Sequence, residues 1–173
     1  LNSYLQQLSF SYRANGDWKG EWETLEKRLQ VAGRTPQGAA GYQLNIYQNM
    51  VLAAARHGSL DQARDILAKS ERLASDLPPR MQQGFRDTAR AQVIRMRAIV
   101  AQESGRFTEA EAASREALAV VSPLVPQEAM LGFPIGILAN LRDAIGEDIA
   151  AALMRQNRLI EAEAEIRRSL LSR

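Results

Sequence analysis

The sequence predicts an all-α protein built from pairs of antiparallel helices. A glycine or asparagine recurs at four places along the chain, each followed two residues later by a large apolar residue. Apolar residues before and after these places recur with the spacing of one side of an α-helix. Between successive pairs, stretches rich in proline or glycine interrupt the helical pattern.

The four recurring residues are predicted to form tight turns inside the helix pairs. Glycine and asparagine accept the left-handed backbone that ends a helix, so each is expected to join a first helix to a second. The large residue two places later closes the corner, and a small residue five places later lets the helices approach closely. The turn residues are Gly16, Gly58, Gly105 and Asn157, and the small residues are Ala63, Ala110 and Ala162, with Gly20 one place early in the first pair.

The bounds of the helices follow from the apolar periodicity and its interruptions. First helices are expected over Asn2–Ala14, Tyr42–Arg56, Arg80–Ser104 and Ile135–Gln156. Second helices are expected over Trp18–Val31, from Leu60 to the Leu77-Pro78 break, from Thr108 onward and over Leu159–Leu171. The segments Gly33–Gly41 and Ser122–Pro134 are expected to be largely irregular.

Two finer expectations concern the last two second helices. Thr108 and Glu111 have the spacing of a capping box at a helix N-terminus. In the last helix, the periodicity places Ala162, Ile166 and Leu170 inward, and Glu161, Glu165 and Arg168 outward.

The clearest copies of the pattern are Ser104–Leu118 and Gln156–Leu170, in which a turn residue, an aromatic or leucine, an alanine and a small residue before a leucine recur. This pattern resembles the tetratricopeptide repeat (TPR) family. The turns lie 42, 47 and 52 residues apart (16 to 58, 58 to 105 and 105 to 157), whereas the usual period of that family is about 34. The resemblance is therefore to a divergent TPR-like protein with longer helices or connections.

The resemblance implies a right-handed α-α superhelix, a TPR-like solenoid, of about four antiparallel helix pairs. A helix pair cannot cover its own apolar side and must stack on neighbours, so we expect residues 1–173 to form a single helical-repeat domain. The chain starts at Leu1 and ends at Arg173 within a helical pattern, and we expect it to be part of a longer protein. Similar repeats occur in large bacterial proteins with an attached caspase-like or signalling domain, which favours a bacterial protein of the cytoplasm or periplasm.

The composition argues against several classes of function. Lys and Arg number 22 against 20 Asp and Glu, a net charge of +2 that provides no strong field for nucleic acid. No apolar run reaches the roughly 18 residues that a membrane span needs. His57 is the only histidine and cysteine is absent, so neither a Ser-His-Asp triad nor a familiar transition-metal site is expected. We therefore expect no enzyme activity, no catalytic residue, no metal and no cofactor.

The resemblance also implies where a partner would bind. In TPR solenoids the first helix of each pair lines a concave groove, and the transferred groove positions include Asn45, Gln48, Arg56, Gln92, Arg95 and Gln102. Amides and arginines suit an extended or acidic peptide. Leu52 and Ile99 stand at the mid-groove positions where some family members carry an asparagine that holds a terminal carboxylate.

These observations favour a non-enzymatic scaffold that binds a partner protein or peptide in the groove. The alternative is a regulatory ligand-sensing domain that controls an attached effector, for which we expect an enclosed pocket containing Phe10, Leu52 and Ile99. A third hypothesis is self-association through the ends of the solenoid, because an uncapped terminal pair exposes apolar surface.

Overall fold

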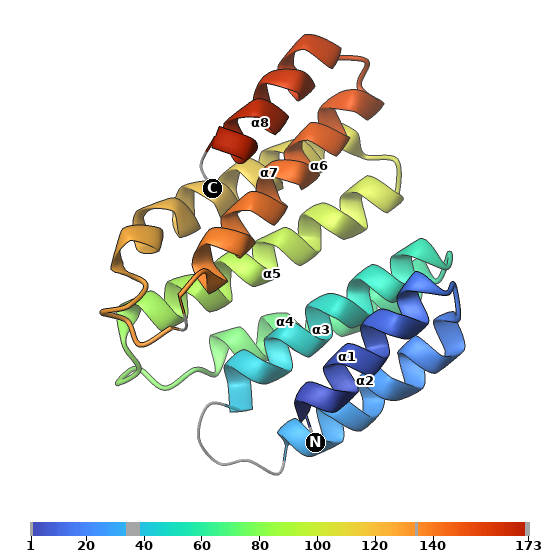
Figure 1. Ribbon diagram of the computed structural model, residues 1–173, viewed down its shortest axis with the longest axis vertical. Coiled ribbons are helices and arrows are strands. Elements are labelled where there is room, and N and C mark those ends of the chain that lie inside the picture. Colours follow the sequence, from blue (N-terminus) through green and yellow to red (C-terminus); the bar gives the residue numbers. More distant parts are fainter. Residues whose placement is uncertain (1, 34–38, 134, 172–173) are drawn as a thin grey trace. The chain divides into compact units, whose positions relative to one another are not determined.

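The computed structural model describes residues 2–33, 39–133 and 135–171. Within these residues the chain folds into eight α-helices and one 3-10 helix, without a β-strand (Figure 1). The predicted all-α class is confirmed. The chain forms two compact units, Leu1–Asp76 (unit 1) and Leu77–Arg173 (unit 2).

Unit 1 consists of two antiparallel helix hairpins. The first pairs α1 (Asn2–Ala14) with α2 (Trp18–Ala32), and the second pairs α3 (Ala39–Arg56) with α4 (Leu60–Ser75). Helix α2 packs against α3, so the second helix of one hairpin meets the first helix of the next. Leu25, Leu44, Ile46 and Val51 are fully buried in this unit.

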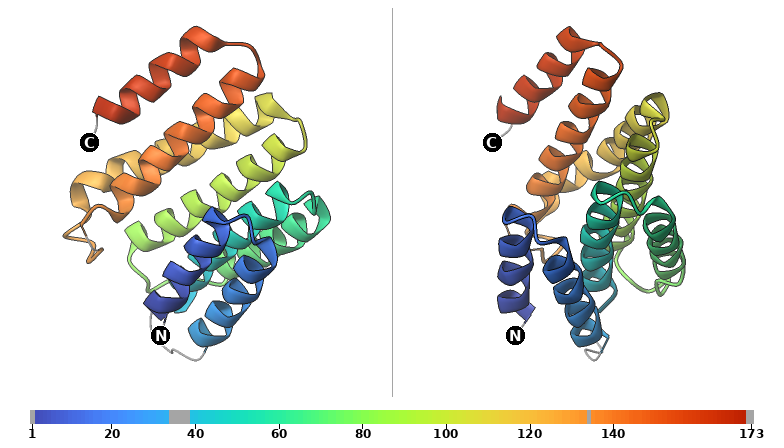
Figure 2. Two further views of the ribbon diagram at one scale, coloured as in Figure 1. Left: turned by 45° about the vertical axis from the view of Figure 1, so that its right-hand side comes forward. Right: turned by 90° about the vertical axis from the view of Figure 1, so that its right-hand side faces the viewer.

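Unit 2 repeats this layout with longer first helices. Its hairpins are α5 (Gln83–Glu103) with α6 (Phe107–Val121), and α7 (Ile137–Arg155) with α8 (Leu159–Leu171). Both views of Figure 2 show the second helix of each hairpin running back beside the first. Helix α6 packs on α7, and the core between them contains Ile94, Ala117, Val121, Leu138, Leu141, Ile145, Ile149 and Leu153.

All four predicted turns are confirmed by their backbone geometry. Gly16, Gly58, Gly105 and Asn157 have φ of +71°, +80°, +76° and +59°. At each turn the next backbone N–H donates to the carbonyl five residues before it, for example from Asp17 to Tyr12 at 2.9 Å and from Arg158 to Leu153 at 3.0 Å. This is the Schellman arrangement, which satisfies carbonyls that would otherwise be unpaired at a helix end.

The small residues after the turns have the predicted role. Ala63, Ala110 and Ala162 are at most 2% exposed. In the first hairpin a Cβ added to Gly20 would lie 2.6 Å from the Cδ1 atom of Tyr12, which is closer than real Cβ contacts. Each second helix therefore passes its partner at a point where only a small side chain fits.

The segment between α6 and α7 is more ordered than the sequence predicted. It begins with the 3-10 helix η1 (Ser122–Gln127) and is closed by a buried carboxylate. Glu128 accepts hydrogen bonds from the backbone N–H of Gly136, at 2.6 Å, and of Leu138. It thereby caps the start of α7. In the other predicted irregular segment, α3 already begins at Ala39, and residues 34–38 lie outside the described residues.

Two of the finer predictions are wrong. Helix α6 starts at Phe107, and Glu111 bonds to arginines and a glutamine instead of completing a capping box with Thr108. On α8, Ile166 and Leu170 are 41% and 59% exposed, whereas Glu165 is 6% exposed. The periodicity misplaced Glu165 because it is neutralised from two sides, by Arg115 of α6 and by Arg168.

Candidate functional site

The six predicted groove residues form two sets of three. Asn45, Gln48 and Arg56 share one side of α3 in unit 1, and Gln92, Arg95 and Gln102 share one side of α5 in unit 2. Both are the first helices of their hairpins, as expected from the sequence.

The set on α3 lies beside a polar contact between first helices. Arg13 of α1 donates to Glu21 of α2 at 2.7 Å and to Asn49 of α3 at 3.0 Å. Gln48, one residue before Asn49, is 8% exposed, and its Oε1 atom has no hydrogen-bond partner among the described residues. Arg56, at the end of α3, is exposed. This side of unit 1 therefore offers one buried acceptor and one accessible cation.

The set on α5 is more strongly engaged within its own unit. Arg95 is 9% exposed and its Nε atom donates to Asp148 of α7 at 2.6 Å. The guanidinium group thus holds the two first helices of unit 2 together. Gln92 and Gln102 are half-buried.

The two units use the same turn-relative position for this contact. Asn49 lies nine residues before Gly58, and Asp148 lies nine residues before Asn157. In each unit this residue accepts a hydrogen bond from an arginine of the preceding first helix. The acceptor position is therefore shared by the two units, whereas the donor position is not: Arg13 lies three residues before Gly16 and Arg95 lies ten residues before Gly105.

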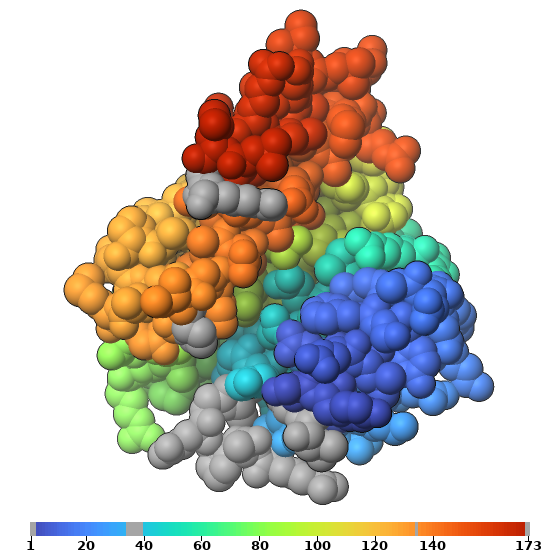
Figure 3. Space-filling view, in the orientation of Figure 1, coloured from blue at the N-terminus to red at the C-terminus, as the bar shows by residue number. Residues whose placement is uncertain are grey.

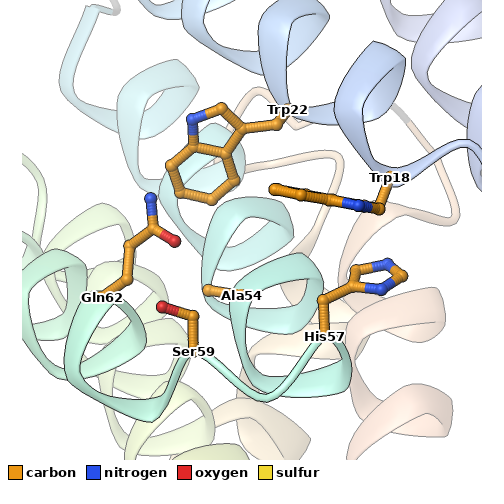
Figure 4. Close-up of a pocket in the computed structure, with 6 residues that line it drawn as sticks. All are labelled: Trp18, Trp22, Ala54, His57, Ser59 and Gln62. Atoms are coloured by element: carbon orange, nitrogen blue, oxygen red, sulfur yellow. The ribbon is translucent and has the colours of Figure 1, made fainter.

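A hollow of about 260 Å³ lies in unit 1 where α2 meets the turn between α3 and α4, a place called here the unit 1 corner. In Figure 4, Trp18 and Trp22 project from α2, and Ser59 and Gln62 stand across the hollow from Trp22, at the start of α4. Ala54 lies between the two sides. The hollow is lined by Trp18, Trp22, Ala54, His57, Ser59 and Gln62.

The aromatic rings of the unit 1 corner are held in place by their neighbours. The ring centroids of Trp18 and His57 are 5.6 Å apart. The indole N–H of Trp22 donates to Glu26 at 2.8 Å, so this group already has its acceptor while the ring lines the hollow. Trp18 and Trp22 are the only two tryptophans in the chain. The hollow thus combines two indole rings with a hydroxyl and an amide.

The corresponding place in unit 2, the unit 2 corner, is filled by a polar network. Arg158 donates to Glu111 at 2.6 Å and to Glu161 at 2.6 Å, and Gln156 donates to Glu111 at 2.9 Å. Burial alone would raise the pKa of Glu111, but hydrogen bonds from Gln156 and Arg115 and the charge of Arg158 hold it below its usual range. The hydrogen bond from Arg158 likewise lowers the pKa of Glu161.

Sequence reasoning missed the unit 1 corner, although the repeat frame contained the signal. The corner lies between two positions: the sixth residue after one turn residue, and the residue directly after the next turn residue. In unit 2 these are Glu111 and Arg158, an opposite-charge pair, whereas in unit 1 they are Trp22 and Ser59. Aligning the copies at these two positions would have shown one closed and one open corner.

Comparison with protein-family models, curated proteins and solved structures gave no match. No helix in the described ranges is both long and apolar enough to cross a membrane. Among the same residues, no group of three or more histidine, aspartate or glutamate side chains is placed to hold a metal ion. The unit 1 corner contains none of Phe10, Leu52 and Ile99, the residues expected in the pocket of a ligand-sensing domain.

Proposed function

We propose that this chain is a helical-repeat module of TPR-like type, a right-handed superhelix of about four helix pairs that binds a partner protein or peptide along its first helices. One observation carries the proposal: the same Schellman turn and the same close helix approach occur in all four hairpins. Repeated hairpins of this kind build extended binding surfaces. On α3 that side carries the exposed Arg56 and, beneath the surface, the Gln48 amide oxygen, which has no hydrogen-bond partner among the described residues.

The proposal is tested with peptides selected from a random phage-displayed library against the 173-residue chain. We expect the selected sequences to be extended and to contain acidic residues, because Arg56 is an accessible donor for carboxylates. In fluorescence polarisation, Arg56→Glu should lower the affinity for such a peptide by about tenfold, which corresponds to the loss of one charged hydrogen bond. Arg95 is unsuitable for this test because its substitution would also break the ion pair that joins α5 to Asp148 of α7.

Arg72→Glu is the matched control, since it makes the same charge change at an exposed site on α4. It should leave peptide affinity unchanged. Equal weakening by both substitutions would show a general charge effect, and unchanged affinity in Arg56→Glu would overturn the first-helix site.

Self-association is a second candidate because α8 carries an uncovered apolar side. Leu159, Ile166 and Leu170 are between 41% and 59% exposed and share one side of the helix, whose surface is red in Figure 3. In α6 the equivalents of Ile166 and Leu170, nine and thirteen residues after the turn, are Ser114, which is buried, and Leu118, which is half-buried against the core shared with α7. We propose that α1 of a second copy covers this side of α8.

Helix α1 presents a fitting surface. Tyr4, 64% exposed, and Leu8, half-buried, stand twelve and eight residues before their turn. The same positions on α7 are Ile145 and Ile149, which are buried in the core shared with α6. A contact of α8 with α1 would therefore repeat the contact of α6 with α7, in a head-to-tail arrangement.

Light scattering at a low and a high protein concentration tests this association. The mass should rise with concentration, and Leu170→Asp should abolish the rise. Ile160→Asp is the control, because Ile160 is 85% exposed on a different side of α8. A mass that stays monomeric at both concentrations would rule the contact out.

A further inference from the structure

The corners of the two units are built from equivalent positions. Each takes the residues two and six after the first turn, and the residues just before and just after the second turn. In unit 2 these are Phe107, Glu111, Gln156 and Arg158, and in unit 1 they are Trp18, Trp22, His57 and Ser59. The unit 2 corner therefore shows what can occupy the same place in unit 1.

In unit 2 a guanidinium group occupies the corner. Arg158 extends from the turn between α7 and α8 back to Glu111 of α6, with an N–O distance of 2.6 Å. Gln156 closes the other side, donating to the Glu111 carboxylate at 2.9 Å and to the Phe107 carbonyl at 3.3 Å. Glu111, the acceptor, is 7% exposed. The chain thus supplies its own cation to this corner.

Unit 1 lacks that cation because Ser59 stands where unit 2 has Arg158. The short side chain leaves the hollow of about 260 Å³. The carboxylate of Glu111 is replaced by the indole ring of Trp22, and Phe107 is replaced by Trp18. Indole faces are the strongest aromatic acceptors for cations, and arginine in particular stacks on them.

The walls of the hollow also carry hydrogen-bond acceptors for a planar cation. The Ser59 hydroxyl and the Gln62 amide lie opposite the Trp22 ring in Figure 4, and each has an oxygen that can accept from a guanidinium N–H. The indole N–H of Trp22 does not compete for these acceptors because it donates to Glu26 at 2.8 Å. An apolar side chain in the hollow could not donate a hydrogen bond to either oxygen.

We propose that the unit 1 corner binds a guanidinium group supplied from outside the chain, in the place that Arg158 fills in unit 2. The site is separate from the first-helix surface proposed above, and it does not depend on that function. The guanidinium can come from an arginine side chain of a peptide or from a free small molecule.

Intrinsic fluorescence tests this binding directly, because Trp18 and Trp22 are the only tryptophans and both line the hollow. The chain is titrated with N-acetylargininamide, with N-acetyl-lysinamide and with N-acetyl-leucinamide. We expect a saturable change with the arginine compound, at an affinity about fivefold above that for lysine, because the planar cation can stack on an indole. Saturation with the leucine compound at equal affinity would overturn the proposal, as would no response to any of the three.

The source of the guanidinium is distinguished by two further probes, methylguanidine and a pentapeptide with arginine between glycines. Equal affinity for the two would assign the site to the free cation, and tighter binding of the peptide would assign it to a protein partner. Either result supports guanidinium recognition. Failure of both to compete with the arginine compound would count against it.

Ser59→Arg supplies a built-in occupant and is the sharpest variant. It should abolish the response to N-acetylargininamide while the melting temperature is kept or raised. Ser11→Arg is the matched control, the same change at an exposed site of α1, and should bind as the original chain does. If Ser59→Arg lowers the melting temperature, Gln62→Leu serves instead, because it removes one hydrogen-bond acceptor. It should lower the affinity for the arginine compound more than the affinity for the lysine compound. Undiminished arginine binding in Gln62→Leu and Ser59→Arg would refute the site.

Discussion

In unit 2 the corner between the hairpins is closed by a buried glutamate, an arginine and a glutamine, whereas in unit 1 the same positions leave a hollow beside two indole rings. The backbone around both corners is alike, with a left-handed turn residue and a buried alanine five residues later. The backbone frame thus sets the geometry of the corner, while two or three side chains decide whether it is filled by a polar network or left hollow.

The composition of the units allows each to be followed separately. All four tyrosines and both tryptophans lie before residue 77, so they belong to unit 1. Tyrosine and tryptophan fluorescence therefore reports on unit 1 alone, whereas circular dichroism reports on the helices of both units.

The largest expected effect tests the shared frame in unit 2. Leu118 packs against the core between α6 and α7, and Leu170, at the same turn-relative position of α8, is 59% exposed. Leu118→Asp should cost about 3 kcal/mol by placing a carboxylate against apolar side chains. Leu170→Asp should change the free energy of unfolding by no more than about 0.5 kcal/mol. Urea unfolding followed by circular dichroism measures both changes in the free energy of unfolding. Equal costs would show that contact with α7 does not make Leu118 more important than Leu170.

A smaller effect is expected at the closed corner. Glu111→Ala removes the shared acceptor of Arg115, Gln156 and Arg158, and should cost about 2 kcal/mol because these donors lose a partly buried partner. Glu163→Ala, the control, breaks an ion pair with Arg167 in which the glutamate is 61% exposed, and should cost about 0.5 kcal/mol or less. The transition seen by fluorescence should not move in either variant. A shift of that transition would mean that the corner stabilises more than unit 2.

The pH dependence of unit 2 follows from the same glutamate. The pKa of Glu111 is lower in the folded chain than the ordinary value of 4.5, so the ionised group stabilises the fold above pH 4.5. That contribution is lost as the pH falls through the lowered pKa, when the group becomes protonated. Glu111→Gln should therefore flatten the loss of helical stability between pH 4.5 and more acidic values. An unchanged acid profile in the variant would argue against the network.

The smallest effect concerns the close approach of α1 and α2 in unit 1. A methyl group at Gly20 would meet the Tyr12 ring at 2.6 Å, whereas a methyl group at Gly41 would meet no atom within 4 Å. Each glycine is the third residue of its helix, which makes the two substitutions well matched. Gly20→Ala should destabilise unit 1 by about 1 kcal/mol, and Gly41→Ala should stabilise it by up to about 1 kcal/mol. Tryptophan fluorescence during urea unfolding will show whether the two changes differ in sign.

The turns were predictable from sequence because each needs a residue that accepts positive φ, and glycine or asparagine at a fixed offset from an apolar residue reveals that need. The exposed side of α8 was not predictable in the same way. Periodicity identifies Ile166 and Leu170 as apolar, but only the neighbouring helices determine which apolar side is covered. Glu165 was misplaced for a related reason, since its burial depends on Arg115, fifty residues earlier in the chain.

Partner binding at the six first-helix positions stays a prediction. The positions lie on α3 and α5 as expected, but sequence did not reveal that Arg95 pairs with Asp148 of its own unit. Its pairing depends on which residue of α7 comes opposite, which spacing within α5 does not reveal. The unit 1 corner was missed because serine after a turn has no signal when read alone; only its comparison with Arg158, at the same position of the other copy, shows that a long side chain is absent there.

The capping of α7 by Glu128 has a consequence for how such a chain can change in length. The carboxylate fastens the backbone at Gly136 and Leu138, eight and ten residues downstream, so the start of α7 is anchored independently of the residues between. Leu131 and Phe133 in this stretch pack against the core of unit 2, so changes in length should be absorbed at its exposed residues, such as Met130, which is 79% exposed. This would let evolution lengthen one copy to 52 residues and leave another at 42 without disturbing the stacking of either.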